Sequence, residues 1–254
     1  MTPREKFMPK GSTTQKDTTP AAVAAKIRHA LKTGGSPEHA EGVQWFFKDE
    51  VKSHGWYTAE LRRAARGFRR DLIKEHGLGF LIQTADQLFS GSVLEEKIAA
   101  VFLLEKLGHE FTDREFDLFE AWLDRIGSWA DHDALVHDLI APLVAAKPAR
   151  IKAIFRWAKS PNRWHRRAAC VALIRGTRAR MFFPQIARLS NLLLKDQDDI
   201  VRKGLGWLLR ETAKFNPAHA IPYLMKIKTT APRLVLRTAC ETLPPAIRKQ
   251  ILSS

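Results

Sequence analysis

The chain of 254 residues has only two cysteines and no apolar run near the roughly 20 residues that a membrane-spanning helix requires. So few cysteines argue against a disulfide scaffold, and no Cys or His pair has zinc-ligand spacing. Cys170 and Cys240 each follow a recurring basic residue by three positions, which predicts equivalent buried helix positions. A Walker-type glycine loop is also missing, so the sequence predicts no metal and no cofactor.

The first nineteen residues are polar and mixed in charge, and they lack the apolar core of a signal peptide. We expect residues 1–19 to form a flexible polar segment and residues 20–254 to form one domain. With no membrane span and no secretion signal, the chain is expected to be a cytoplasmic monomer.

Positive charge dominates the composition. Lys and Arg number 42 against 27 Asp and Glu, for a formal net charge of +15. Such a balance favours a nucleic acid or an anionic membrane surface as partner. The basic residues are spread along the chain and are not gathered on one amphipathic helix, so nucleic acid is the better prediction.

A short pattern recurs about every 35 residues along most of the chain. The equivalent positions are Arg63, Lys97, Asp133, Arg167, Lys203 and Arg237. They are separated by 34, 36, 34, 36 and 34 residues, a period typical of stacked helix pairs. Together with apolar residues spaced by three and four, the repeat predicts an all-α fold. The expected architecture is a curved solenoid, or superhelix, of about six HEAT-like antiparallel helix pairs, and the first pair is expected over 21–31 and 38–53.

Equivalent positions of such a solenoid line its concave face, so five of the six recurring residues would form a row of cations. A row of cations neutralises phosphates, and further basic residues and a tryptophan stand beside it. The residues expected to contact DNA are Arg63, Lys97, Arg163, Trp164, Arg166, Arg167, Lys203, Arg210 and Arg237. With no single recognition helix, the contacts are expected to be mainly to the backbone.

The third copy of the repeat carries Asp133 where the other copies carry a base. A carboxylate weakens phosphate binding but stabilises positive charge, such as the oxocarbenium character that develops when an N-glycosidic bond breaks. Trp129 precedes Asp133 by four residues and Trp207 follows Lys203 by four, spacings that share a helical face. An indole ring there would contact a nucleobase, and a cationic alkylated base most strongly.

Other interpretations of these residues stay open. Asp133 also suits a helix N-terminus or an ion pair with a neighbouring arginine. Trp207 has leucines around it and suits a core position. His132 and His165 are interpreted as surface residues without a catalytic role.

Two segments are similar to a known family: Asn162 to Ala169 (NRWHRRAA) and Lys203 to Glu211 (KGLGWLLRE), with a weaker match from Phe46 to Gly55. Over about residues 38–242 the chain resembles the DNA alkylation repair family of HEAT-like-repeat glycosylases, the AlkD type. The resemblance implies a monofunctional glycosylase that excises positively charged N3- or N7-alkylated purines from double-stranded DNA.

The resemblance also implies roles for individual residues. Asp133 corresponds to the family's catalytic carboxylate, Trp129 and Trp207 to its aromatic walls, and Arg167 and Arg210 to its phosphate-contacting arginines. Ala130 and His132 depart from the pattern, because better-known members carry bulkier aromatic or aliphatic residues there. Two alternative functions are a non-catalytic HEAT-repeat protein that binds bent or branched DNA, and a scaffold for protein interactions.

Overall fold

A computed structural model describes residues 18–253, which fold almost entirely into helices. The helices are α1 (Pro20–Gly34), α2 (Pro37–Gln44), α3 (Thr58–Phe89), α4 (Leu94–Leu104), α5 (Asp113–Trp122), α6 (Trp129–Leu135), α7 (Ala141–Ala146), α8 (Ile151–Trp157), α9 (Arg163–Val171), α10 (Ile174–Thr177), α11 (Phe183–Leu193), α12 (Asp199–Phe215), α13 (Pro217–Ile227), α14 (Arg233–Ala239) and α15 (Pro245–Leu252). No strand forms within residues 18–253; one isolated bridge joins Lys52 to Val93. The predicted flexible segment lies mostly outside the described residues, since only Thr18 and Thr19 of it are included.

Side-chain caps set the beginnings of several helices. The Thr19 hydroxyl accepts a hydrogen bond from Ala22 N (3.2 Å), and the Asn162 amide oxygen accepts one from Trp164 N (2.9 Å). The Asp198 carboxylate accepts from Ile200 N in the same way (2.9 Å). Each cap satisfies an amide that the first helical turn leaves without a partner, so α1, α9 and α12 begin where the sequence places a capping residue.

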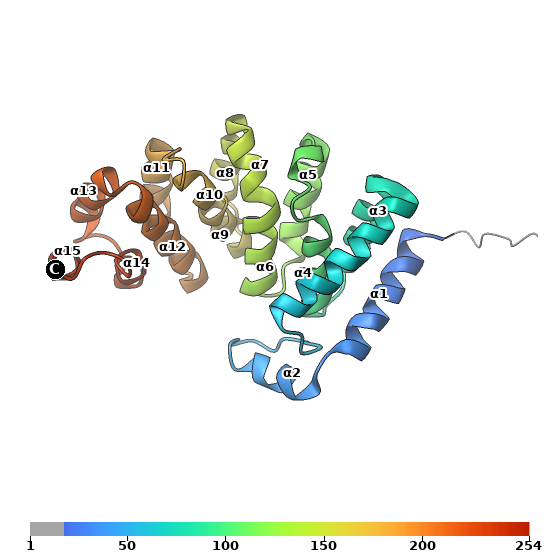
Figure 1. Ribbon diagram of the computed structural model, residues 1–254. Helices are drawn as coiled ribbons and strands as arrows, with labels where there is room; N and C mark the ends of the chain where they lie inside the picture. The colour runs from blue at the N-terminus through green and yellow to red at the C-terminus, as the bar shows by residue number, and fades with distance from the viewer. Residues whose placement is uncertain (1–17, 254) are drawn as a thin grey trace, which may run out of the picture.

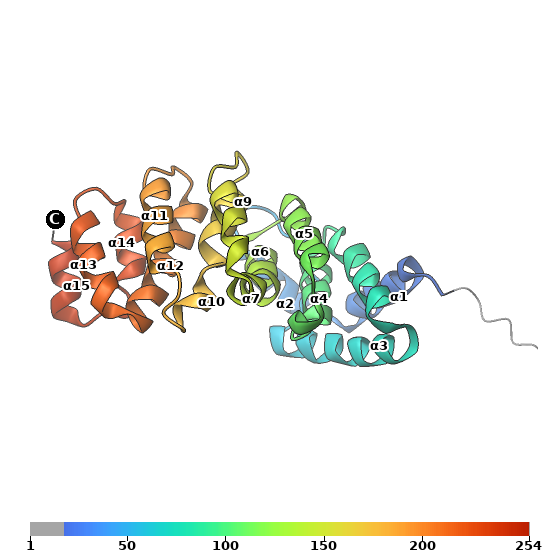
Figure 2. The same ribbon diagram turned by 90° about the horizontal axis from the view of Figure 1, so that it is seen from above.

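The helices form two layers that follow one another along an arch, from α1 at one end to α15 at the other (Figures 1 and 2). In one layer α3 contacts α4, α4 contacts α6, α6 contacts α9, α9 contacts α12, and α12 contacts α14. We call these six helices the inner layer. Each carries one of the six recurring positions found in the sequence. The prediction of an all-α repeat solenoid is therefore confirmed.

One continuous hydrophobic core joins the two layers from Val23 to Ile251. Trp122 and Trp157, from the outer layer, are among its largest fully buried side chains. The predicted burial of Cys170 and Cys240 is also confirmed. Because each helix pair shares this core with the adjacent pairs, the position of each inner helix is set by the pairs next to it in the stack.

The expected second helix over 38–53 is wrong in length, because α2 ends at Gln44. The Gln44 side chain replaces the helical hydrogen bonds that would follow: its amide donates to Asp49 O (3.0 Å) and accepts from Val51 N (3.0 Å). Residues 45–57 therefore form a loop, which Figure 1 shows below the row of helices, next to α2. We call residues 45–51 the aromatic turn.

The α12–α14 contact in the inner layer depends on a glycine. A Cβ atom on Gly206 would lie 2.6 Å from Thr238 Cβ and 3.1 Å from Val235 O. We expect Gly206→Ala to lower the free energy of unfolding by about 1–3 kcal/mol, because backbone and a short side chain must move apart.

Gly67, within α3, is the matched control because a Cβ there meets nothing within 4 Å. Gly67→Ala should raise the free energy of unfolding by about 0.5–1 kcal/mol, as expected for Gly to Ala within a helix. Urea unfolding measures both variants. Equal midpoints for the two would contradict the close-packing explanation.

Candidate active site

Asp133, on α6, is held by an arginine of the next inner helix. Arg167 Nε donates to Asp133 Oδ1 (2.9 Å) and Arg167 Nη2 donates to Oδ2 (2.6 Å). The remaining terminal nitrogen, Nη1, donates to Ile200 O (2.7 Å) and so ties α9 to α12. The side chain of Asp133 keeps 20% exposure, while that of Arg167 is buried. The carboxylate is thus fixed in direction yet still reaches solvent.

His132 is the second partner of Asp133, and its burial shows that the surface position expected from the sequence is wrong. Its ring is fully buried, with Nδ1 2.7 Å from Asp133 Oδ1 and Nε2 3.1 Å from Trp164 O. Burial lowers the pKa of His132, although the hydrogen bond to Asp133 acts in the opposite direction. A neutral imidazole has one N–H, and the charged carboxylate is the stronger acceptor. We therefore assign that proton to Nδ1, where it is donated to Asp133. Nε2 then carries no proton, and its approach to Trp164 O is a contact without a hydrogen bond.

These contacts leave the two oxygens of Asp133 unequal. Burial raises the pKa of the carboxyl group, but hydrogen bonds from His132 and Arg167 outweigh it, and the net pKa is lowered. Asp133 is accordingly ionised at neutral pH. Oδ1 lies near two donors and Oδ2 near one, so within residues 18–253 Oδ2 has the greater remaining capacity to accept a hydrogen bond.

The tryptophans beside the inner helices differ in exposure. Trp129, one helical turn before Asp133, is 38% exposed, and one side of it is covered by Phe47 of the aromatic turn, with ring centroids 5.1 Å apart. Trp207 is half-buried against the core. Part of the Trp207 side chain therefore packs on the core and part stays accessible, so both interpretations left open by the sequence apply to it.

A π-helical turn follows Asp133 over Val136–Ile140. Such a turn adds one residue to the helix and is often found at functional sites. It brings His137 beside Trp207, with ring centroids 6.2 Å apart and an interplanar angle of 13°. Sequence reasoning missed His137, because ordinary helical spacing does not predict an inserted residue.

The residues expected to bind DNA fall into three groups. Arg63, Arg163, Lys203 and Arg237 are exposed. Arg166 is half-buried and pairs with Asp196 (2.6 Å), and Arg210 is half-buried and pairs with Glu241. Lys97, Trp164 and Arg167 are buried.

The burial of this third group corrects the sequence analysis. Lys97 donates to Arg125 O, lies 3.7 Å from Asp131 and sits over the Phe89 ring, so its ammonium belongs to the interior. The guanidinium of Arg167 donates its hydrogen bonds to Asp133 and to Ile200 O. Neither is a cation on an open surface, because each compensates a buried acceptor.

Trp164 is 9% exposed and packs beside His132, so little of its ring is available to a ligand.

Because Lys97 and Arg167 are buried, the predicted row of five cations is interrupted at its centre. The exposed recurring bases, Arg63, Lys203 and Arg237, lie on either side of the Asp133 site along the inner layer.

A cavity of about 340 Å³ opens between the aromatic turn and the beginnings of α6, α9 and α12. Its lining includes Phe46, Phe47, Trp129, Arg163 and Lys203. Flat rings and cations thus meet one helical turn from Asp133, at a place assembled from four separate segments of the chain.

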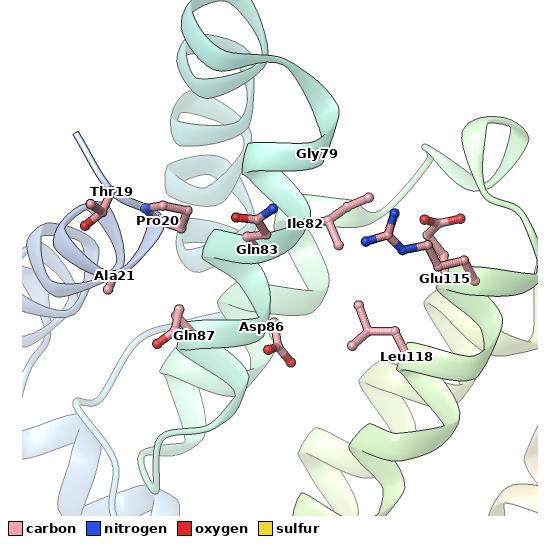
Figure 3. Close-up of a pocket in the computed structure, with 11 residues that line it drawn as sticks. Thr19, Pro20, Ala21, Gly79, Ile82, Gln83, Asp86, Gln87, Glu115 and Leu118 are labelled. Carbon is pink, nitrogen blue, oxygen red and sulfur yellow. The ribbon is translucent and has the colours of Figure 1, made fainter. Parts of the chain in front are cut away.

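A larger cavity, of about 680 Å³, lies between α1, α3 and α5 (Figure 3). No residue predicted for the site lines it. Its Asp86 accepts hydrogen bonds from Trp122 Nε1 (2.8 Å) and Arg125 (2.7 Å), so this carboxylate holds helices together. We therefore place the candidate site at Asp133.

Comparison with known proteins identifies the family of the chain. The sequence profile of a family described as DNA alkylation repair enzyme matches residues 27–243. The chain belongs to this family. Since the family is described as a DNA alkylation repair enzyme, DNA is the implied substrate.

Solved structures of the repair family share the fold. A predicted DNA alkylation repair enzyme from Enterococcus faecalis is 17% identical, with a TM-score of 0.74 over 83% of this chain and 97% of that one. AlkD2 from Streptococcus mutans is 18% identical, with a TM-score of 0.61 over 88% of this chain and 99% of that one. Among curated proteins, none is significantly similar.

Within residues 18–253 no group of three or more His, Cys, Asp or Glu side chains is arranged to hold a metal ion. In the same part of the chain, every helix is too short or too polar to cross a membrane.

The lowered pKa of His132 predicts a pH-dependent stability. The unfolded chain takes up this proton near pH 6.5, whereas the folded chain takes it up only at lower pH. The unfolded state therefore binds more protons below about pH 6.5, and this contribution to stability falls as the pH drops through that window. His132→Val removes it.

Urea unfolding at several pH values between about 7 and 5 tests this. The midpoint of the wild-type protein should fall more steeply toward acid than that of His132→Val. Parallel pH dependence in the two proteins would show that His132 titrates alike in the folded and unfolded chains.

Proposed function

We propose that the protein is a DNA glycosylase that hydrolyses the N-glycosidic bond of positively charged N3- or N7-alkylated purines in double-stranded DNA. The observation that carries this proposal is the state of Asp133: ionised, fixed by two partners, and partly exposed one helical turn from an exposed indole. A carboxylate prepared in this way stabilises positive charge without having to reorganise.

In the proposed reaction the bond between C1′ and the purine nitrogen breaks, and its electron pair leaves with the base. The cationic purine becomes neutral, and the sugar acquires oxocarbenium character. Water then forms the new C1′–O bond and loses a proton. We assign two roles to Oδ2 of Asp133, the oxygen that accepts fewer hydrogen bonds: it stabilises the developing positive charge and orients this water.

His132 and Arg167 act in this scheme as positioning residues. Together they direct three N–H groups at Asp133 and keep the pKa of its carboxyl group low. Trp129 and Trp207 would contact the alkylated base, to which an indole face offers cation–π attraction. Phosphates would be contacted by exposed basic residues, namely Arg163, Lys203 and Arg237.

The monomeric state and the cytoplasmic location of the protein stay predictions.

One observation favours the alternative function, a non-catalytic HEAT-repeat protein that binds bent or branched DNA. The Asp133–Arg167 pair joins α6 to α9, so the carboxylate also has a structural use. The two functions differ in one outcome, because only a glycosylase releases a base.

Asp133→Asn tests the catalytic assignment. Purified wild-type protein should release 7-methylguanine or 3-methyladenine from methylated duplex DNA. Because the amide carries no charge to stabilise the sugar, the variant should lose about 100- to 1,000-fold of the single-turnover rate. Its DNA affinity should be unchanged or higher, since a negative charge near phosphate is removed.

Asp199→Asn is the matched control. Asp199 is an exposed carboxylate that lines the 340 Å³ cavity and makes no contact with Asp133 in the structure. The rate of this variant should stay near that of wild type. A wild-type protein that binds DNA without releasing a base would leave only the non-catalytic alternative.

The positioning role of His132 is tested by two substitutions. His132→Val removes one hydrogen bond to Asp133, so the pKa of the carboxyl group should rise and the acid limb of the pH–rate profile should move to higher pH. His132→Asn places an amide N–H as many bonds from Cα as Nδ1 and should restore most of the wild-type profile. A slower rate with an unmoved acid limb in His132→Val would assign His132 to packing alone.

A further inference from the structure

The aromatic turn exposes two adjacent rings. Trp45 is 91% exposed and Phe46 is 74% exposed, the highest values among the exposed large hydrophobic side chains of the described residues. Isolated exposed apolar side chains are ordinary, but neighbouring aromatic rings on one turn favour a surface that a partner covers.

The exposure does not arise from a loose chain. Gln44 spans the turn through its side chain, with Nε2 donating to Asp49 O (3.0 Å) and Oε1 accepting from Val51 N (3.0 Å). Phe47 differs from its two exposed neighbours because it is half-buried. Its ring stacks on Trp129 at an interplanar angle of 20°. The turn is therefore braced at its base and fixed to α6.

A second brace lies just after the turn. The buried carboxylate of Glu95, on α4, accepts hydrogen bonds from Ser53 Oγ, His54 N and Gly55 N. The loop that presents Trp45 and Phe46 thus joins α2 to α3 and is fixed to α4 through Glu95 and to α6 through Trp129. A ring held in place in advance loses little conformational entropy when a ligand stacks on it.

The surroundings of the turn indicate the chemistry of the partner. Phe46 lines the same cavity as three cations and three carboxylates, namely Lys48, Arg163, Lys203, Asp49, Asp198 and Asp199. Arg163 lies 3.7 Å from Asp49 and 3.8 Å from Asp198, which offsets part of its charge, whereas Lys48 and Lys203 are exposed. Flat apolar rings beside cations match a ligand with stacked flat faces and repeated negative charge. A second copy of this chain, with net charge +15, would be repelled.

We propose that Trp45 and Phe46 form an aromatic wedge that stacks on the bases of duplex DNA next to the Asp133 site, while Arg163 and Lys203 contact the flanking phosphates. The wedge holds open a base step whose stacking is weakened by a lesion or a missing base. This inference rests on the DNA-binding part of the proposed function and not on base release.

The experiment uses the full chain and a duplex with one tetrahydrofuran abasic site, with 2-aminopurine as its neighbour. Because the stacking of bases on aromatic side chains is lost, Trp45→Ala/Phe46→Ala should weaken binding by roughly 10- to 100-fold. The 2-aminopurine fluorescence change on binding should also be lost. The slope of log affinity against log salt should stay the same, because no cation is removed.

Two controls separate stacking from other effects. Leu192→Ala removes an exposed apolar side chain from α11 and should change neither affinity nor fluorescence. Lys203→Ala should weaken binding and reduce the salt slope by about 0.9. Phe46→Trp should keep the fluorescence response, since a larger ring occupies the same position.

The wedge is wrong if the double variant keeps wild-type affinity and fluorescence response, which would point to a protein partner for the turn. It is also wrong if the double variant instead loses a self-association that sedimentation detects in wild type. A protein that releases no base but shows the expected stacking losses would overturn the proposed glycosylase function and leave the wedge intact.

Discussion

The ion pair between Asp133 and Arg167 is the interaction on which the candidate site depends. A carboxylate at this depth is stable only because a guanidinium and an imidazole direct N–H groups at it. The pair also explains why Arg167 is buried, although the chain has many more basic than acidic residues. The charge of Arg167 compensates that of the carboxylate, and the exposed basic residues on either side are available to bind phosphate.

The solenoid supplies what this pair needs. α6 and α9 contact each other, and one recurring position on each helix places Asp133 opposite Arg167. The next recurring position belongs to Lys203, whose helix accepts the third Arg167 hydrogen bond through Ile200 O. The rigid stack therefore orients a charged group to a degree that a single surface loop does not reach.

The period of the sequence was enough to predict the all-α solenoid, the inner helices and the recurring position on each. It was not enough to predict exposure. Lys97 and Lys203 are equivalent in the repeat, yet Lys97 is buried and Lys203 is exposed. The difference comes from Asp131, the carbonyl of Arg125 and the Phe89 ring, which surround the ammonium of Lys97. Such contacts depend on segments distant in sequence, as does the packing of His132 beside Trp164.

Asp133 and Arg167 come from successive repeats, so the site belongs to a junction between two units and to neither unit alone. Repeat proteins commonly gain or lose units in evolution, and their stability is close to a sum over neighbours. Gain or loss of a helix pair at either end of this solenoid would leave the junction intact. A unit inserted between α6 and α9 would separate the two charges and leave Arg167 buried without its carboxylate partner, so an insertion at this boundary would disrupt the site.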